Sequence, residues 1–265
     1  MVCGCSFSAV STLPEYAGTS WSEVLAKKLD WNLVNLARQG CSNGGIRLQI
    51  EEVLKQKPSF AIIVPTGINR MEIPACGLEE ETNILTASYK FLENLVLKKP
   101  IKGYDRNLGV DNLNYGHNDY RLISETMFSL TSPWQHTYRK ELLKPEIHEA
   151  VRQYIMYLYD SEWKMQQDEW ILRDGLNQLH QAKIPFLVFT SFTFLQTAEK
   201  LKLLMNNSEY EKYLIDDERK SPIEVCNSHP YDKQIGDPGY HTSPEGQLVV
   251  AENCYDIIKN RWNLC

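Results

Sequence analysis

The sequence predicts an α/β protein, a three-layer α/β/α sandwich in which a central parallel sheet lies between two layers of helices. Short apolar runs alternate along the chain with longer segments whose apolar residues recur every three or four positions. This alternation is typical of parallel strands joined by right-handed helical crossovers. One run, Phe60–Val64, is apolar at every position, as in a strand buried on both faces. The chain has 265 residues, 43% of them hydrophobic, which is enough for a full core without disulfides or metals.

The predicted strands are short apolar runs bounded by turn-forming residues. Gly4 follows the first run directly, so only a short strand is expected there. In chain order the runs are Val2–Cys3, Leu33–Leu36, Phe60–Val64 and 185–189.

The predicted helices combine helical apolar spacing with residues suited to the first turn. Thr19 or Ser20 is expected to cap the first helix. Ser243-Pro244-Glu245 supplies a cap, a first-turn proline and a first-turn acid for the last one. The helical pattern covers residues 21–29, 46–54, 151–158, 170–179 and 244–258.

Two stretches, residues 70–145 and 195–235, interrupt the alternation with prolines and scattered polar residues. No linker rich in Pro, Gly or Ser divides the chain, and no internal repeat is visible. We therefore expect residues 1–265 to form a single domain with insertions at about 70–145 and 195–235.

Composition excludes several classes of function. The net charge of −6 and the lack of a basic cluster argue against a nucleic-acid partner. No apolar stretch approaches a membrane span and the first residues lack the pattern of a secretion signal, so we expect a cytoplasmic protein with no membrane partner. The seven scattered cysteines suit reduced thiols, most of them in the core. We expect no cofactor and no metal.

Chemically interesting side chains cluster in loops that follow the predicted strands. In an open parallel sheet such loops converge at the carboxyl ends of the strands. A serine, a histidine and an acid in converging loops can make an activated hydroxyl, and glycine amides with an asparagine amide can stabilise an oxyanion. The loops are Gly4–Ser8, Gly40–Asn43, Thr66–Arg70 and Asp237–Ser243.

The order of these loops resembles the four sequence blocks of the SGNH (GDSL-like) hydrolases. Gly4-Cys5-Ser6 is similar to the Gly-Asp-Ser block, with Cys5 in the Asp position. Gly40 resembles the glycine of the second block, and Gly67-Ile68-Asn69 resembles the Gly-x-Asn block. His241 stands where the fourth block has its histidine.

Two departures from the family pattern lie at the site itself. Asp237 precedes His241 by four positions, whereas the family separates the two residues by three. Arg70 replaces the aspartate that usually follows the asparagine of the third block.

The resemblance implies a flavodoxin-like sheet and a serine esterase. Ser6 would attack the acyl carbon, His241 would carry the proton, and Asp237 would orient the imidazole. The backbone amides of Ser6 and Gly40 and the side chain of Asn69 would hold the oxyanion. The substrate would be a small-molecule or carbohydrate ester. Aromatic residues of the first insertion favour the carbohydrate: Tyr104, Tyr115, Tyr120, Trp134 and Tyr138.

Three alternatives stay open from the sequence. Gly40-Cys41-Ser42-Asn43-Gly44 fits the Gly-x-Ser-x-Gly nucleophile elbow, which would make Ser42 the nucleophile, although only one strand precedes it. Cys3, Cys5 and Cys41 could gather around a soft metal, but Cys3-x-Cys5 is poorly spaced for zinc. The chain could also be an inactive binding or structural protein, virion-associated if phage-encoded, that meets a protein partner or oligomerises through its insertions.

Overall fold

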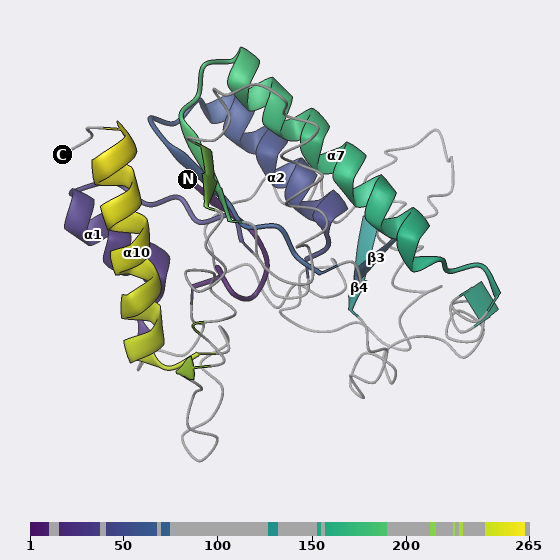
Figure 1. The fold of residues 1–265 in the computed structure, drawn as a ribbon, viewed down its shortest axis with the longest axis horizontal. Helices are drawn as coiled ribbons and strands as arrows, with labels where there is room; N and C mark the ends of the chain where they lie inside the picture. The colour runs from purple at the N-terminus through teal and green to yellow at the C-terminus, as the bar shows by residue number, and fades with distance from the viewer. Residues whose placement is uncertain are drawn as a thin grey trace, which may run out of the picture.

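The computed structural model describes the parts of the chain that hold the main sheet and its helices (Figure 1). The described residues are 1–10, 16–37, 41–67, 70–74, 127–131, 153–154, 157–189, 213–215, 225, 228–229 and 242–262.

The main sheet is parallel, with the strand order β1-β2-β5-β6. Its strands are β1 (Val2–Cys3), β2 (Ala61–Ile63), β5 (Phe186–Phe189) and β6 (Leu214–Ile215). Beyond β1 runs the predicted strand Leu33–Leu36, reduced to a single parallel bridge between Val2 and Asn35. The Val2 N–H donates to the Val34 carbonyl at 2.9 Å and the Leu36 N–H donates to the Val2 carbonyl at 2.7 Å. The mixed helical and parallel-sheet architecture confirms the predicted α/β class.

The helices pack in two pairs. Helix α1 (Trp21–Leu29) lies beside α10 (Pro244–Trp262), and α2 (Asn43–Gln56) lies beside α7 (Ser161–Gln181) (Figure 1). Each pair buries its own hydrophobic cluster, and successive residues of a strand alternate between the two clusters. Ile63 packs in the cluster of α2 and α7, whereas its neighbour Ile62 packs in the cluster of α1 and α10.

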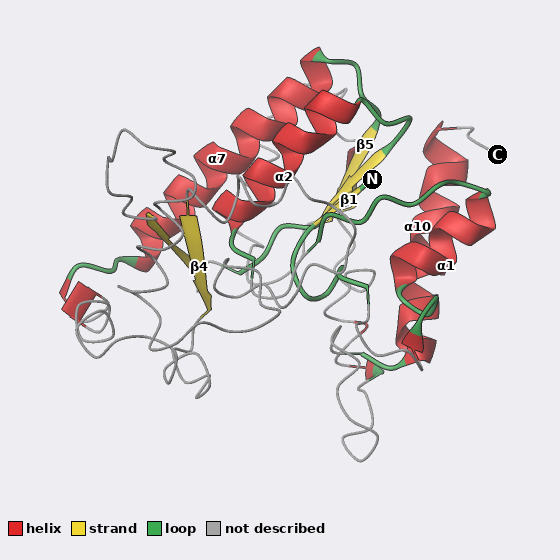
Figure 2. Ribbon diagram, turned by 180° about the vertical axis from the view of Figure 1, so that it is seen from behind, coloured by secondary structure: helices red, strands yellow, loops and turns green. Residues whose placement is uncertain are grey.

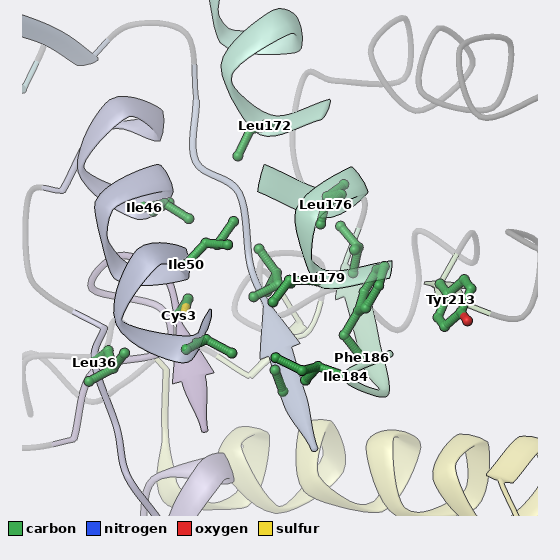
Figure 3. Packing of buried hydrophobic residues seen from close by; sticks show 14 of the residues in the cluster. Cys3, Leu36, Ile46, Ile50, Leu172, Leu176, Leu179, Ile184, Phe186 and Tyr213 are labelled. Atoms are coloured by element: carbon green, nitrogen blue, oxygen red, sulfur yellow. The ribbon is translucent and has the colours of Figure 1, made fainter. Parts of the chain in front are cut away.

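The cluster under α2 and α7 shows how helical spacing fills this core (Figure 3). Ile46 and Ile50 of α2 face Leu172, Leu176 and Leu179 of α7. All five side chains are buried, and at this depth truncating one of them to alanine costs about 2–5 kcal/mol.

Capping at three helix starts follows the sequence closely. Ser20 and Glu23 form a capping box at α1, so Ser20 rather than Thr19 is the cap. Ser243 Oγ accepts the Gly246 N–H at 3.2 Å, as predicted for the last helix. Ser42 caps α2 by accepting the Gly45 N–H at 3.3 Å.

Strands also occur inside the two stretches predicted as insertions. β3 (Arg70–Pro74) pairs antiparallel with β4 (Met127–Thr131) in a second sheet, apart from the main one (Figure 2). β6 lies within the stretch 195–235 and joins the main sheet beside β5. The sequence analysis missed all three strands. The aromatic residues named for the first insertion, Tyr104, Tyr115, Tyr120, Trp134 and Tyr138, lie outside the described residues. No helix in the described part of the chain is both long and apolar enough to cross a membrane.

Candidate active site

Ser6 lies in a tight turn directly after β1. The Ser8 and Ala9 N–H groups both donate to the Cys5 carbonyl, at 2.9 and 3.1 Å, which closes the turn around Ser6. The Ser6 side chain is buried. Gly4 opens the turn because the space beside it is filled: a Cβ there would lie 2.9 Å from Ser8 Oγ and 3.2 Å from Val64 Cβ. A glycine thus lets the loops after β1 and β2 approach each other closely.

Gln49 of α2 holds the backbone of this turn. Its side chain is fully buried, and Oε1 accepts the Gly4 N–H at 2.7 Å while Nε2 donates to the Gly4 carbonyl at 3.2 Å. Nε2 also lies 3.4 Å from the sulfur of Cys41, the residue that follows Gly40. One buried amide therefore ties the Ser6 turn to the loop that starts α2.

Asn43 does the same for the loop after β2. Its Oδ1 accepts the Thr66 N–H at 2.8 Å, and its Nδ2 donates to the Thr66 carbonyl at 2.9 Å. Nδ2 also donates to Asp168 Oδ2 at 2.9 Å, from the facing helix α7. Asn43, Thr66 and Asp168 are all buried. Asn43 thereby fixes the segment that leads to Gly67, the first residue of the predicted third block.

The start of α10 reaches the Ser6 turn through a single side chain. The Trp21 N–H donates to Gln247 Oε1 at 2.7 Å, and its indole Nε1–H donates to the Phe7 carbonyl at 2.9 Å. In the turn before Gln247, Thr242 Oγ1 and the Ser243 N–H both bond the His229 carbonyl. Thr242 directly follows His241 in the chain, so the described end of the fourth loop lies one residue, Trp21, away from the turn that carries Ser6.

Buried polar atoms without hydrogen-bond partners occur on the same loops. Among the described residues these include Ser8 Oγ, after β1, and Thr66 Oγ1, after β2. Glu169 Oε2 on α7 is buried and unpartnered as well. Such groups are rare in folded proteins and concentrate where a ligand or a water supplies the missing bond.

Of the predicted site residues, the structure describes Ser6. The other four, Gly40, Asn69, Asp237 and His241, lie outside the described residues. Shared contacts join the loops that lead to or from three of these positions, but the Ser6–His241 contact and the oxyanion donors stay predictions.

The elbow hypothesis for Ser42 does not agree with the geometry. An elbow serine projects its hydroxyl from a strained turn, whereas Ser42 is fully buried and its hydroxyl accepts the Gly45 N–H as a helix cap. The hydroxyl is occupied in holding the first turn of α2, which explains why a serine stands there.

The nearby cysteines are core residues. Cys3, Cys5 and Cys41 are buried in the apolar cluster of α2 and α7, and Cys254 is buried in the other cluster. Burial raises the pKa of the Cys3 thiol, which disfavours the thiolate that a metal or a nucleophilic role requires. Cys76, Cys226 and Cys265 lie outside the described residues.

Sequence reasoning missed the supporting residues. Gln49 carried a usable signal, because it occupies an apolar-stripe position between Ile46 and Val53 where a polar side chain needs a buried partner. Asn43 lay in a loop already marked as chemically interesting. Asp168 gave no signal, since α7 carries polar residues on every face of that turn.

Geometry defines an α/β protein with a serine turn at the carboxyl end of β1, tied to two other loops by buried amides. No protein-family model matches the chain, and no curated protein matches it. Among solved structures, a protein assigned to the lipolytic G-D-S-L family, from Desulfitobacterium hafniense DCB-2, is similar with a TM-score of 0.42 and 10% identity, over 97% of each chain.

Proposed function

We propose that this protein is a serine hydrolase of carboxylic esters built on an SGNH-type three-layer α/β/α sandwich. One observation carries the proposal: the Ser6 turn is joined by buried hydrogen bonds to the loops that resemble the second and third SGNH blocks. The links run through Gln49 and Asn43, and Trp21 extends them to the start of α10.

Strand order supports the position of this site. Numbered along the chain, the extended segments follow the order second, first, third, fourth, fifth across the sheet, starting from the segment at Asn35. In sheets of this order, ligands bind where the order reverses, beyond the carboxyl ends of the first and third strands. Ser6 follows the first of these, β1, and Gly67 follows the other, β2. The candidate nucleophile therefore stands at the position where such folds bind ligands.

The proposed reaction proceeds in two halves. Ser6 Oγ bonds to the acyl carbon as its proton moves to His241, and the alcohol then leaves with that proton. Water adds to the acyl-enzyme with His241 as base, and the acid leaves as the Ser6 proton returns. Asp237 would orient the imidazole. The amides of Ser6 and Gly40 and the side chain of Asn69 would hold the oxyanion, each donor being worth about 3 to 4 kcal/mol.

Substrate choice is proposed on weaker chemistry. Aromatic residues of the stretch 70–145 favour a carbohydrate ester, since flat aromatic faces stack on sugar rings. The rival is a binding or structural protein that keeps the scaffold without turnover, which the Asp237–His241 spacing and Arg70 would suit.

Two matched serine variants test the proposal. The protein is treated with a fluorophosphonate, the adduct is mapped by mass spectrometry, and hydrolysis of p-nitrophenyl acetate is followed for wild type, Ser6→Ala and Ser42→Ala. We expect the adduct on Ser6, and no adduct and no turnover in Ser6→Ala. Ser42→Ala should lose about 1 kcal/mol of stability with its cap but keep both readouts.

The outcomes separate the alternatives. An adduct on Ser42 would overturn the nucleophile assignment. Absence of both adduct and turnover in the wild type, tested on acetylated sugars as well, would support the binding-protein alternative.

A further inference from the structure

We propose that Asp168 is a positioning residue, which holds the Asn43 amide in the orientation that fixes the loop leading to Asn69. This inference rests on the proposed function for its catalytic consequence. The contact itself belongs to the described structure: Asn43 Nδ2 donates to Asp168 Oδ2 at 2.9 Å.

The orientation of the Asn43 amide matters because its two ends differ. Oδ1 accepts the Thr66 N–H and Nδ2 donates to the Thr66 carbonyl, so the loop backbone is held in both directions. A flipped amide would set Nδ2 against the Thr66 N–H and Oδ1 against the Asp168 carboxylate. An ionised carboxylate only accepts, which excludes the flipped form.

Lys164 completes the arrangement. It lies one helical turn before Asp168 on α7, and its Nζ bonds the other carboxylate oxygen, Oδ1. Oδ2 is therefore left for Asn43. The ion pair also supplies the countercharge that a fully buried carboxylate needs.

Stability alone is a poor reason for this pair. Desolvating two charges costs several kcal/mol per ion, and a buried ion pair replaced by apolar residues is often neutral or stabilising. At least nine tenths of each side chain, Lys164 and Asp168, is buried. The one neutral partner that this pair reaches through Oδ2 is Asn43, whose bonds run to the site loop. Directional control of that amide accounts for charges that the fold does not otherwise require.

Two double variants isolate the contact. Both remove the buried charges, but Lys164→Met/Asp168→Asn leaves an acceptor for Asn43 Nδ2, whereas Lys164→Met/Asp168→Leu does not. Thermal unfolding shows that each variant folds. Hydrogen exchange of peptides spanning β2 and Thr66 reports the loop, and kcat and KM for p-nitrophenyl acetate report its consequence.

We expect the Asp168→Leu double variant to exchange the Thr66 amide about tenfold faster, the effect of one weakened hydrogen bond. Its kcat should fall about tenfold to hundredfold with KM nearly unchanged, because misplaced donors act in the transition state. The Asp168→Asn double variant should stay close to wild type in both readouts.

Equal behaviour of the two double variants would overturn the positioning role, because only one of them lacks the acceptor. If the wild type hydrolyses no ester, the proposed function fails, while amide exchange at Thr66 still decides whether Asp168 holds the loop.

Discussion

Replacing Gln49 by leucine should weaken the fold and the candidate site together. Leucine keeps much of the volume but removes the acceptor of the Gly4 N–H and the donor to the Gly4 carbonyl. A buried backbone group left unsatisfied costs about 1–3 kcal/mol, so the two together cost about 2–5 kcal/mol, less a part regained from the added apolar surface. For a chain of this size about 3 kcal/mol corresponds to a Tm lower by roughly 6–12 °C.

Gln56→Leu supplies the matched control for this change. Gln56 ends the same helix and bonds Glu52 on an exposed surface. Its substitution should move Tm by no more than about 0.5 kcal/mol equivalent. Both variants are followed by circular dichroism on heating and by ester hydrolysis, and only Gln49→Leu should lose kcat. A Gln49→Leu protein as stable and as active as Gln56→Leu would refute the reasoning, because Gly4 would then not depend on the amide.

Two further predictions concern the α1 and α10 layer. Ser20→Ala removes the capping box of α1 and should lower stability by about 1 kcal/mol, measured by urea unfolding; an unchanged midpoint would contradict the role of the cap. Burial raises the pKa of the Cys254 thiol above its ordinary value of 9.0, so its contribution is present below pH 9 and is lost as pH rises further. Stability of the wild type should therefore fall by about 1 kcal/mol per pH unit above pH 9 relative to Cys254→Ala, in urea titrations at pH 8 and pH 10, and parallel loss in both proteins would refute this linkage.

Helices and buried strands could be predicted because their signals are local. Ser20 and Ser243 cap the helices as their sequence patterns indicate, and the apolar run at 60–64 contains β2. A cap or an apolar period depends on neighbours within a few residues, so one sequence contains the whole signal.

The strands inside the expected insertions could not be predicted for the opposite reason. β3 and β4 pair across more than fifty residues, and β6 has only two residues, Leu214–Ile215. Their strand character depends on a partner that is remote in the chain, while their own composition is mixed. Asp168 escaped for the same reason, since its importance comes from Asn43, on another helix.

Helix α2 explains how three separate loops keep a common geometry. Gln49 fixes the turn after β1, Asn43 fixes the loop after β2, and both side chains project from the same fourteen-residue helix. Because a helix is stiff over this length, the relative position of the two loops is set by one rigid body rather than by the loops themselves. The neutral amides also hold both loops without placing a charge beside Ser6, so the local field there is left to the groups that would carry the chemistry. Fixing a site by two amides on one helix therefore combines positional precision with electrostatic neutrality, which is what an uncharged nucleophile needs from its support.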